Sequence, residues 1–438
     1  MLRERNIIRS VACETFMKQM PTQEFRHKTR IEDAMRLFLE VMRPSAVREV
    51  DLVPIEKARG RVLAQRVVAK EYLPPFNLSV VDGYAVRSID LRGSSSKRPV
   101  SMRLRGESRL GEVCSLSVQR GEAVAVATGS MTPKGADAVV MVEDAKELKG
   151  GMVEFRMPVD RWQGITRKGE DVSPGAVILE KGNRLRPEDI GALKTVGLRR
   201  VQVVRRVRAG ILSTGNELVE SATKKSRGKI VDINRPILSG MLEELGAEVV
   251  DLGIVRDNEP AIETALRNGL AKSDLLLVTA GSSVGRRDLV PACINRLGRP
   301  GMVVHGVAMR PAMPTGLAVI RGKPVVSLPG FPVSAMVAFR VFVPALFAKL
   351  AGAAEPLQPT LQAVLSERIT GVPGHRTFVR VRVKKVGDGY RADPLKLQRS
   401  SILSSMVHAN GIVTVAESVR AIEAGTKVIV TLTGCSAG

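Results

Sequence analysis

Polar side chains and glycines gather directly after three apolar runs of the chain. The segments are STGNELVE at 213–220, VTAGSSVGRRD at 278–288 and SLPGFPVSA at 327–335. A glycine-rich loop that leads into a helix presents N–H groups to an anion, and a carboxylate such as Asp288 can hold Mg²⁺ against phosphate oxygens. Each loop alone is equally compatible with a plain turn, but three together favour a site for a phosphate group and a metal. The second loop is no GxxxxGKS or GxxxxGKT sequence, and GxGxxG is absent.

The elements that must position these loops alternate between strand and helix from residue 208 onward. AGILSTG, AEVVDLGIV, DLLLVTAG and VVSLPG are typical of strands, and PILSGMLEELG, EPAIETALRNGL, RDLVPACINRLG and PVSAMVAFRVFVPALFAKLAG of helices. This alternation predicts a mostly parallel sheet with helices on both faces. Ligands bind such sheets beyond the carboxyl ends of the strands, which is where the three loops lie.

Two helices are predicted outside this alternating region. TRIEDAMRLFLEVMR has apolar residues at helical spacing and a capping box of Thr29 and Glu32. RPEDIGALKTVG at 186–197 predicts a helix with Pro187 in its first turn and Gly197 as its stop.

Two regions have β texture. Residues 73–160 carry short β segments with frequent Gly, Ser and Pro, and residues 356–438 predict a small C-terminal barrel or sandwich. With 438 residues the chain is long enough for two to four domains. A multidomain α/β plus β protein is therefore expected.

The chain is strongly basic, with 67 Lys and Arg residues against 44 Asp and Glu and a net charge of +23. Phosphate neutralisation on nucleic acid is one interpretation. However, the basic residues are spread along the chain, and aromatic residues for stacking bases make up only 3%. We therefore expect an arginine-rich solvated surface, as in a hot or salty cytosol, with anionic small molecules as ligands and no specific nucleic acid.

The cysteines and the apolar runs indicate in which cellular compartment the protein is expected. The four cysteines show no CxxC spacing and the four histidines are scattered, which disfavours a zinc finger or a secreted disulfide framework. No uninterrupted apolar stretch is long enough to span a bilayer, and the N-terminus lacks a signal-peptide core. We expect a soluble cytoplasmic protein with no membrane partner, preceded by an N-terminal extension at 1–28.

Nine colinear segments carry a family resemblance. They are LPPFNLSVVDGYAV (73–86), ATGSMTPKGADAVVMVED (127–144), RKGEDVSPG (167–175), STGNEL (213–218), VDINRPIL (231–238), LGIVRDN (252–258), GSSVGRRD (281–288), RPAMPTG (310–316) and LPGFPVSA (328–335). In these segments the chain resembles the MoeA family, the molybdopterin molybdenumtransferases that also form the C-terminal domain of gephyrin. The α/β region is also similar to MogA/MoaB adenylyltransferases and CinA-like proteins, but DGYAV and GEDVSPG belong to the MoeA type.

The resemblance implies a domain organisation, for an archaeal or thermophile-like variant of the family. We expect a MogA/MoaB-like three-layer α/β domain that carries the active site, a discontinuous, segment-swapped helical domain, an inserted β-rich domain and a C-terminal β-barrel. The α/β domain would span 207–355, the helical domain 29–72 and 161–206, the insert 73–160, and the barrel 356–438. The protein would be a homodimer.

The resemblance also implies a reaction in molybdenum cofactor biosynthesis. Enzymes of this family take adenylylated molybdopterin and molybdate, here molybdate or tungstate, and release AMP. Mg²⁺ or another divalent cation would neutralise charge on the phosphoanhydride oxygens as it is cleaved. A MogA/MoaB-type adenylyltransferase is the expected partner enzyme.

Six side chains match catalytic positions of the family: Asp82, Thr128, Asp171, Glu217, Asp257 and Asp288. Asp257 and Asp288 would share the metal ion near the adenylate phosphate. A second subunit would contribute Asp82 and Thr128 across the dimer cleft.

Several of these residues also have a purely structural interpretation. Asp82 and Asp171 could hold turns, and Thr128 could cap a strand end. Glu217 could stabilise the first turn of a short helix. Asp288 could begin the predicted helix at 287–297 with no metal.

Ten further residues are expected to contact the substrate: Thr214, Gly215, Gly281, Ser282, Ser283, Gly285, Arg310, Pro311, Pro329 and Pro332. In the second loop, the N–H groups with Ser282 or Ser283 would hold an anionic group. Gly281 and Gly285 would allow the backbone to approach that group closely.

The chain departs from the family pattern at the edge of the expected substrate site. Arg310, stiffened by Pro311, would contact molybdate or phosphate. The loop after it reads PAMP where the family has PGKP, so Ala312 and Met313 replace a glycine and a lysine, and Phe331 in LPGFP replaces a polar residue. Two alternatives stay open: an altered preference such as tungstate over molybdate, or a non-catalytic molybdopterin-binding or scaffold paralogue on the same fold.

Overall fold

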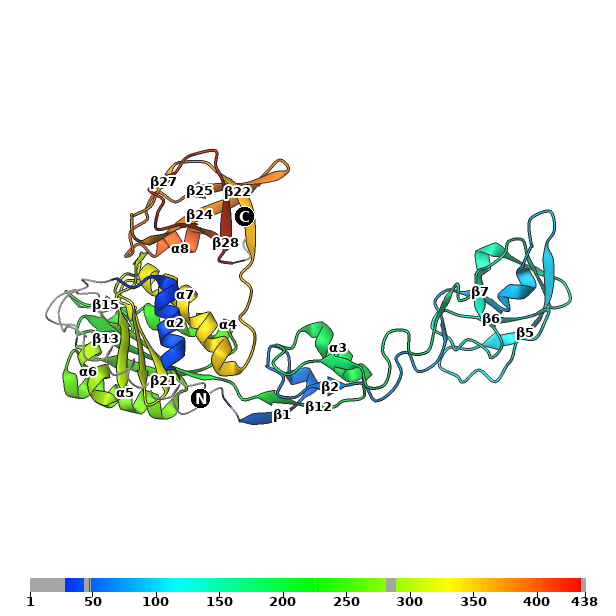
Figure 1. The fold of residues 1–438 in the computed structure, drawn as a ribbon, viewed down its shortest axis with the longest axis horizontal. Coiled ribbons are helices and arrows are strands. Elements are labelled where there is room, and N and C mark those ends of the chain that lie inside the picture. Colours follow the sequence, from blue (N-terminus) through cyan, green and yellow to red (C-terminus); the bar gives the residue numbers. More distant parts are fainter. Residues whose placement is uncertain (1–27, 43–46, 48, 225, 281–288, 435–438) are drawn as a thin grey trace, which may run out of the picture.

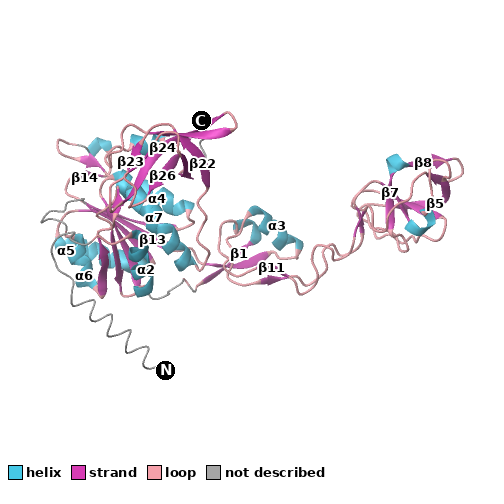
Figure 2. Cartoon of the chain, turned by 45° about the horizontal axis from the view of Figure 1, so that its top comes forward, coloured by secondary structure: helices cyan, strands magenta, loops and turns pink. Residues whose placement is uncertain are grey.

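The computed structural model describes residues 28–434 except 43–46, 48, 225 and 281–288. The protein is elongated, with an α/β domain and a β-barrel at one end and a β-rich insert at the other (Figures 1 and 2). A small mixed unit lies between them. Apart from Lys28, the predicted N-terminal extension falls outside the described residues.

A six-stranded sheet forms the centre of the α/β domain, in the order β16-β13-β17-β21-β20-β18. The strands are β13 (Arg208–Thr214), β16 (Glu248–Val255), β17 (Leu275–Ala280), β18 (Pro300–His305), β20 (Gly316–Ile320) and β21 (Lys323–Pro329). The first four strands in the order are parallel to one another, which confirms the mostly parallel sheet predicted from the alternating pattern.

The edge formed by β20 and β18 is antiparallel and was not predicted. β20 turns into β21 through Arg321 and Gly322, which have φ angles of 52° and 83°. Two residues with positive φ form the tight connection that suits antiparallel strands. The short Arg-Gly turn is thus the local signal for this hairpin.

Five helices cover the two faces of the sheet. They are α2 (Ile31–Val41), α4 (Asn234–Glu244), α5 (Glu259–Lys272), α6 (Val290–Leu297) and α7 (Pro332–Ala351). Leu275 and Leu277 of β17 join a core with α2, α4 and α7, whereas Leu276 and Val278 join a second core with α5 and α6. The strand is buried on both sides, as its continuous apolar run predicts.

Helix α2 lacks the capping box predicted from the sequence. No side-chain capping hydrogen bond is present at its start. Thr29 instead forms a parallel β-bridge with Val307, and Glu32 pairs with Arg376 of the barrel at 2.6 Å. Thr29 and Glu32 therefore make tertiary contacts instead of forming the capping box that the local pattern predicts.

The same helix packs on the α/β domain, whereas the family resemblance implies that residues 29–72 belong to the discontinuous unit. Ala34 and Phe38 are fully buried in the core that α2 shares with α4 and α7. The contacts of α2 are with β18 and β20. The chain thus adds a helix to the α/β domain before it enters the discontinuous unit.

The discontinuous unit is built from two stretches of chain. Its elements are β1 (Val50–Pro54), η1 (Ile55–Lys57), β2 (Val67–Val68), β11 (Val177–Leu179), α3 (Pro187–Thr195) and β12 (Arg200–Val204). β1 pairs antiparallel with β12, and β2 with β11. α3 follows the sequence prediction: Pro187 is its first residue and Gly197, with φ of 79°, follows its end.

The insert is a six-stranded sheet in the order β7-β4-β6-β5-β9-β8, reached through the paired strands β3 and β10. Its elements are β3 (Leu78–Ser79), β4 (Gly83–Val86), η2 (Ser88–Leu91), β5 (Val100–Ser108), β6 (Glu122–Val126), β7 (Ala138–Met141), η3 (Val142–Asp144), β8 (Ala145–Leu148), β9 (Met152–Phe155) and β10 (Ile165–Thr166). Gly83 has a positional role, because a Cβ there would lie 1.9 Å from the backbone oxygen of Val140. Only glycine allows β4 and β7 to pair at that point.

The C-terminal region is a closed five-stranded barrel, which confirms the predicted barrel. β24 pairs with β25, and the order continues through β22, β28 and β26 back to β24. The elements of this region are β22 (Thr360–Leu365), β23 (Ile369–Thr370), β24 (Arg376–Val386), β25 (Gly389–Pro394), α8 (Ser404–His408), β26 (Gly411–Val415), β27 (Ala421–Ile422) and β28 (Lys427–Leu432). The remaining short elements, which precede this region, are β14 (Leu218–Val219), η4 (Ala222–Lys224), β15 (Ile230–Val231) and β19 (Met309–Arg310). β19 of the α/β domain pairs with β24 and ties the barrel to it.

Helix α7 is the one described helix whose length and composition would allow it to cross a membrane. However, 72% of its most apolar window is buried inside the protein. An all-round apolar helix buried in this way is a core helix.

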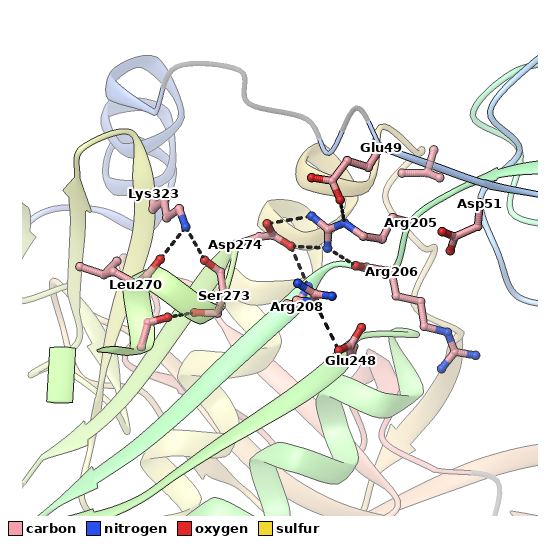
Figure 3. Close-up of polar contacts among 12 residues, drawn as sticks. Glu49, Asp51, Arg205, Arg206, Arg208, Glu248, Leu270, Ser273, Asp274 and Lys323 are labelled. Carbon is pink, nitrogen blue, oxygen red and sulfur yellow. Dashed lines mark hydrogen bonds and ion pairs between the residues drawn. The ribbon is translucent and has the colours of Figure 1, made fainter. Parts of the chain in front are cut away.

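Arg205 joins the discontinuous unit to the α/β domain (Figure 3). Its two Nη atoms donate to the two carboxylate oxygens of Asp274 at 3.1 and 3.2 Å, and its Nε donates to Glu49 at 2.5 Å. The Asp274 carboxylate also accepts the backbone N–H of Arg208 at 2.8 Å. The hydrogen bonds with Asp274 raise the pKa of Arg205, so its guanidinium is charged over the whole physiological range.

This joint yields a prediction for stability. Asp274→Asn should lower the free energy of unfolding by about 1–3 kcal/mol, because it removes a charge that two nitrogens of the half-buried Arg205 share. The melting temperature should fall by several degrees. Glu423→Gln is the matched control, since its pair with Arg368 is exposed and contributes less than about 0.5 kcal/mol. Equal melting temperatures for the two variants would show that the Arg205 pair does not stabilise the joint.

Candidate active site

The carboxyl ends of three parallel strands lie side by side at one edge of the α/β sheet. β13 ends at Thr214, β17 at Ala280 and β21 at Pro329. The register places Ser213 beside Thr279, and Ala280 beside Pro329. The loops singled out in the sequence therefore leave the sheet from neighbouring strands.

The side chain of Thr214 is used within this edge. Thr214 is 2% exposed, and its hydroxyl donates to the backbone oxygen of Thr279 at 3.4 Å. The hydroxyls of Ser213 and Thr279 are 2.9 Å apart. Thr214 thus links two strand ends through its side chain, and the predicted substrate contact would have to come from its backbone.

Asp257 is bound to the loop after β13 by two reciprocal hydrogen bonds. The N–H of Asn216 donates to Asp257 Oδ2 at 3.2 Å, and the N–H of Asp257 donates to Asn216 Oδ1 at 3.2 Å. Glu217 lies over the same loop, because a Cβ at Gly215 would be 2.8 Å from its carboxylate. Lys229 donates to the backbone oxygen of Asn216. Two acidic residues and a lysine thus gather at the ends of β13 and β16.

Five predicted site residues fall outside the described residues: Gly281, Ser282, Ser283, Gly285 and Asp288. The helix predicted at 287–297 is described from Val290 onward as α6. Within the described parts of the chain, no three His, Cys, Asp or Glu side chains are grouped to hold a metal ion.

A cleft of about 820 Å³ separates the α/β domain from the barrel. The α/β side contributes Arg310, Pro311, Pro329 and Phe331, and the barrel side includes Arg380. Its further basic residues are Arg368, Lys396 and Arg399, against the single acid Glu367. Pro332 is the first residue of α7 and is buried beside the cleft. A smaller cavity of about 230 Å³ lies at the opposite edge of the sheet, around Arg184 and Arg205.

Arg380 forms no ion pair with a carboxylate in the part of the chain that the structure describes. It is 1% exposed, and burial lowers the pKa of its guanidinium to about 10, which still leaves it charged at neutral pH. Nε donates to Ser405 at 3.0 Å, whereas Nη2 has no hydrogen-bond partner among the described residues. Gln398 binds the backbone of Arg380 on both sides and holds the neighbouring loop against it. An unpaired buried guanidinium is costly, and an anion is its natural partner.

Nothing in the sequence singles out Arg380 as a site residue. It lies in TFVRVRVKKV, where Arg380 and Arg382 look alike, and only the fold buries the first and exposes the second. The PAMP loop also lines the cleft. Ala312 has φ of 87° although it carries a Cβ, so the backbone shape survives the loss of glycine at a cost of about 1–2 kcal/mol.

Asp82 and Thr128 meet in the insert. Asp82 Oδ1 accepts the backbone N–H of Thr128 at 2.7 Å and its hydroxyl at 3.1 Å. Both residues are exposed. The insert lies at the far end of the molecule from the sheet edge described above (Figures 1 and 2). The fold of the chain thus brings these two residues into contact with each other. It does not bring them near the predicted site residues at the sheet edge.

Asp171 lies in the connection between the insert and the discontinuous unit. Its N–H donates to the backbone oxygen of Leu73 at 3.1 Å, and Leu73 also forms a β-bridge with Val172. Its carboxylate is exposed. The structure therefore separates Asp171 from both Asp257 and Glu217.

Comparison with known families matches the whole architecture. Residues 29–197 match the MoeA N-terminal region (domain I and II), residues 210–348 a probable molybdopterin-binding domain, and residues 362–433 the MoeA C-terminal region (domain IV). The three matches follow one another in the order of the described domains.

Individual relatives agree over most of their length. Molybdopterin molybdenumtransferase 2 of Mycobacterium tuberculosis is 32% identical over 91% of this chain and 98% of its own length. The molybdopterin molybdenumtransferase of Staphylococcus aureus is 31% identical over 87% of this chain and 90% of its own. The crystal structure of the molybdopterin biosynthesis MoeA protein from Pyrococcus horikoshii OT3 matches with a TM-score of 0.81, 31% identity, and coverage of 93% and 100%. The chain belongs to the MoeA family of molybdopterin molybdenumtransferases.

Proposed function

We propose that this chain transfers the metal of molybdate or tungstate to adenylylated molybdopterin and releases AMP. It would act in the cytoplasm, as a transferase of molybdenum cofactor biosynthesis. The observation that carries the proposal is the buried, unneutralised Arg380 in the cleft beside Arg310. A scaffold would gain nothing from burying such a charge, whereas an enzyme that must capture an oxyanion would.

The cleft suits a tetrahedral dianion. Arg380 Nη2 has no hydrogen-bond partner among the described residues and lies in a low-dielectric setting, where a charge-assisted hydrogen bond is strong. Arg310 offers a second guanidinium from the α/β side. Met313 and Phe331 line the same space where the family pattern has a lysine and a polar residue. We propose that these apolar replacements tune the choice between tungstate and molybdate.

The loops at the sheet edge suit the adenylate. Asp257 is exposed and oriented by Asn216, and Glu217 lies next to it. We propose that Asp257 with Asp288 holds Mg²⁺ or another divalent cation. Mg²⁺ commonly takes one or two carboxylates together with substrate phosphates, so a group of three acids is not required. When bound, the cation supplies positive charge at the phosphoanhydride.

The remaining catalytic residues would come from a second subunit. Asp82 and Thr128 are fixed to each other but lie far from the sheet edge of their own chain. In a symmetric homodimer, the insert of one subunit can reach the α/β domain of the other. We propose that each active site combines Asp257 of one subunit with Asp82 and Thr128 of its partner. A MogA/MoaB-type adenylyltransferase would supply the substrate.

The metal assignment predicts the effect of removing one ligand. Asp288→Asn should reduce cation-dependent AMP release by about 100-fold or more, because the charge of the phosphoanhydride would lose its counter-ion. The melting temperature should not change. Asp388→Asn, in the exposed β24–β25 turn, is the matched control and should be fully active. Full activity of Asp288→Asn would refute the metal assignment.

The oxyanion assignment predicts opposite effects on binding and stability. Arg380→Met should weaken molybdate binding by at least about tenfold, since it removes a charge-assisted hydrogen bond. The melting temperature should stay equal or rise, because an unpaired buried charge is lost. Titration calorimetry and thermal unfolding on the same samples measure both. Arg382→Gln, exposed two residues along β24, is the control. A lower melting temperature with unchanged molybdate affinity would make Arg380 a structural residue.

The shared site predicts complementation between inactive chains. Asp82→Ala and Asp288→Asn should each be inactive alone. An equal mixture after subunit exchange should recover about a quarter of the wild-type activity, because half the dimers are mixed and each has one intact site. If the mixture shows no recovery although mixed dimers form, the site lies within one subunit.

A further inference from the structure

Asn234 lies at the sheet edge. Among the described residues, the NH₂ group of its side-chain amide forms a hydrogen bond and the amide oxygen does not. It is the first residue of α4 and is 8% exposed. Its Nδ2 donates to the backbone oxygen of Gly330 at 2.8 Å. Its Oδ1 is buried and has no hydrogen-bond partner among the described residues. Asn234 lies in the segment VDINRPIL at 231–238, but neither the predicted site residues nor the proposed function includes this side chain.

The position of Asn234 is fixed from below by Asp232. Asp232 Oδ1 accepts the backbone N–H groups of Asn234 at 3.1 Å and Arg235 at 3.3 Å, which caps the start of α4. The other carboxylate oxygen pairs with Arg235 Nε at 3.1 Å. The first turn of the helix, and with it the amide, is thereby held in one place.

The amide is also held in one orientation. Gly330 O can only accept a hydrogen bond, so it selects the NH₂ half of Asn234 and leaves the oxygen on the other side. Gly330 follows Pro329, the last residue of β21, and precedes α7. The unused oxygen therefore lies at the edge from which the loops after β13, β17 and β21 leave the sheet.

A buried acceptor without a partner costs roughly 1–3 kcal/mol, and such atoms in native proteins call for an explanation. We infer that Asn234 Oδ1 accepts a hydrogen bond from an N–H or O–H group of the bound substrate. The oxygen carries partial negative charge, so it disfavours a phosphate or molybdate oxygen and selects a neutral donor. Asn234 would thus bind the organic part of the substrate by a hydrogen bond, while the arginines of the cleft bind the oxyanion.

This inference rests on the proposed function, because the donor belongs to adenylylated molybdopterin. Two parts of that molecule carry such donors: the adenosine part and the pterin part. The same residue would also be a positioning residue for the LPGFP turn through Gly330. The test must therefore separate substrate contact from support of the turn.

Asn234→Ala removes both the acceptor and the Nδ2 donor to Gly330 O, whereas Asn234→Asp keeps an acceptor oxygen and removes only the donor. Asn234→Asp should therefore bind the substrate more tightly than Asn234→Ala, and an equal loss in both variants would assign the effect to the turn and overturn the inference. Asn410→Ala is the matched structural control. Asn410 is a buried amide in the barrel, with its Oδ1 accepting from Val383 N–H at 2.6 Å and its Nδ2 donating to Val383 O at 2.9 Å. Affinity for AMP is measured by calorimetry, KM and kcat with adenylylated molybdopterin by AMP release, and melting temperature on the same samples.

Asn234→Ala should raise KM for adenylylated molybdopterin by about tenfold with a smaller change in kcat. If affinity for AMP falls equally, the donor lies in the adenosine part; if it does not fall, the donor lies in the pterin part. Asn410→Ala should lower the melting temperature and leave both binding constants within about twofold. The inference is overturned if the folded fraction of Asn234→Ala binds AMP and substrate as wild type does. Failure of the proposed function looks different, because the wild-type protein itself would then release no AMP.

Discussion

The parallel pairing of β17 with both β13 and β21 is the constraint on which the site depends. Parallel neighbours end at one edge of a sheet, so three loops that are far apart in sequence must leave it side by side. The pairing of β13 with β16 then brings Asp257 to the loop after β13, where Asn216 holds it by two hydrogen bonds. Burial on both faces keeps this sheet rigid, because two helical layers leave its central strands no freedom to slip.

The second half of the site depends on how the barrel is fixed to the α/β domain. β19 pairs with β24, and Arg376 at the start of β24 bridges Glu32 of α2 and Glu417 of the barrel at 2.6 and 2.9 Å. The pairing places Arg310 next to Thr377, and both residues line the cleft. The same strand buries Arg380 three residues later. One strand therefore anchors the barrel and carries a guanidinium into the cleft.

The sequence was sufficient for the features that repeat along the chain, and insufficient for those that a distant contact decides. The alternation of apolar runs predicts the parallel strands, because a strand buried on both faces must be continuously apolar. Thr29 and Glu32 have the sequence pattern of a capping box, but in the structure Thr29 forms a β-bridge with Val307 and Glu32 forms an ion pair with Arg376. Likewise Arg380 and Arg382 are alike in sequence, and only closure of the barrel buries one of them. The contact of Asp82 with Thr128 joins two segments of the insert that were expected in the site for reasons of resemblance alone.

Because the insert lies far from the sheet edge of its own chain, we propose that the enzyme works as a pair of subunits, and this proposal requires that the chain carries out metal transfer. The most direct test is incubation of the wild-type protein with adenylylated molybdopterin, Mg²⁺ and either molybdate or tungstate, with AMP measured over time. We predict AMP release that requires both the cation and the oxyanion and ceases when either is withheld. Binding of adenylylated molybdopterin without any release of AMP under these conditions would contradict it and would make the chain a binding protein on the same fold.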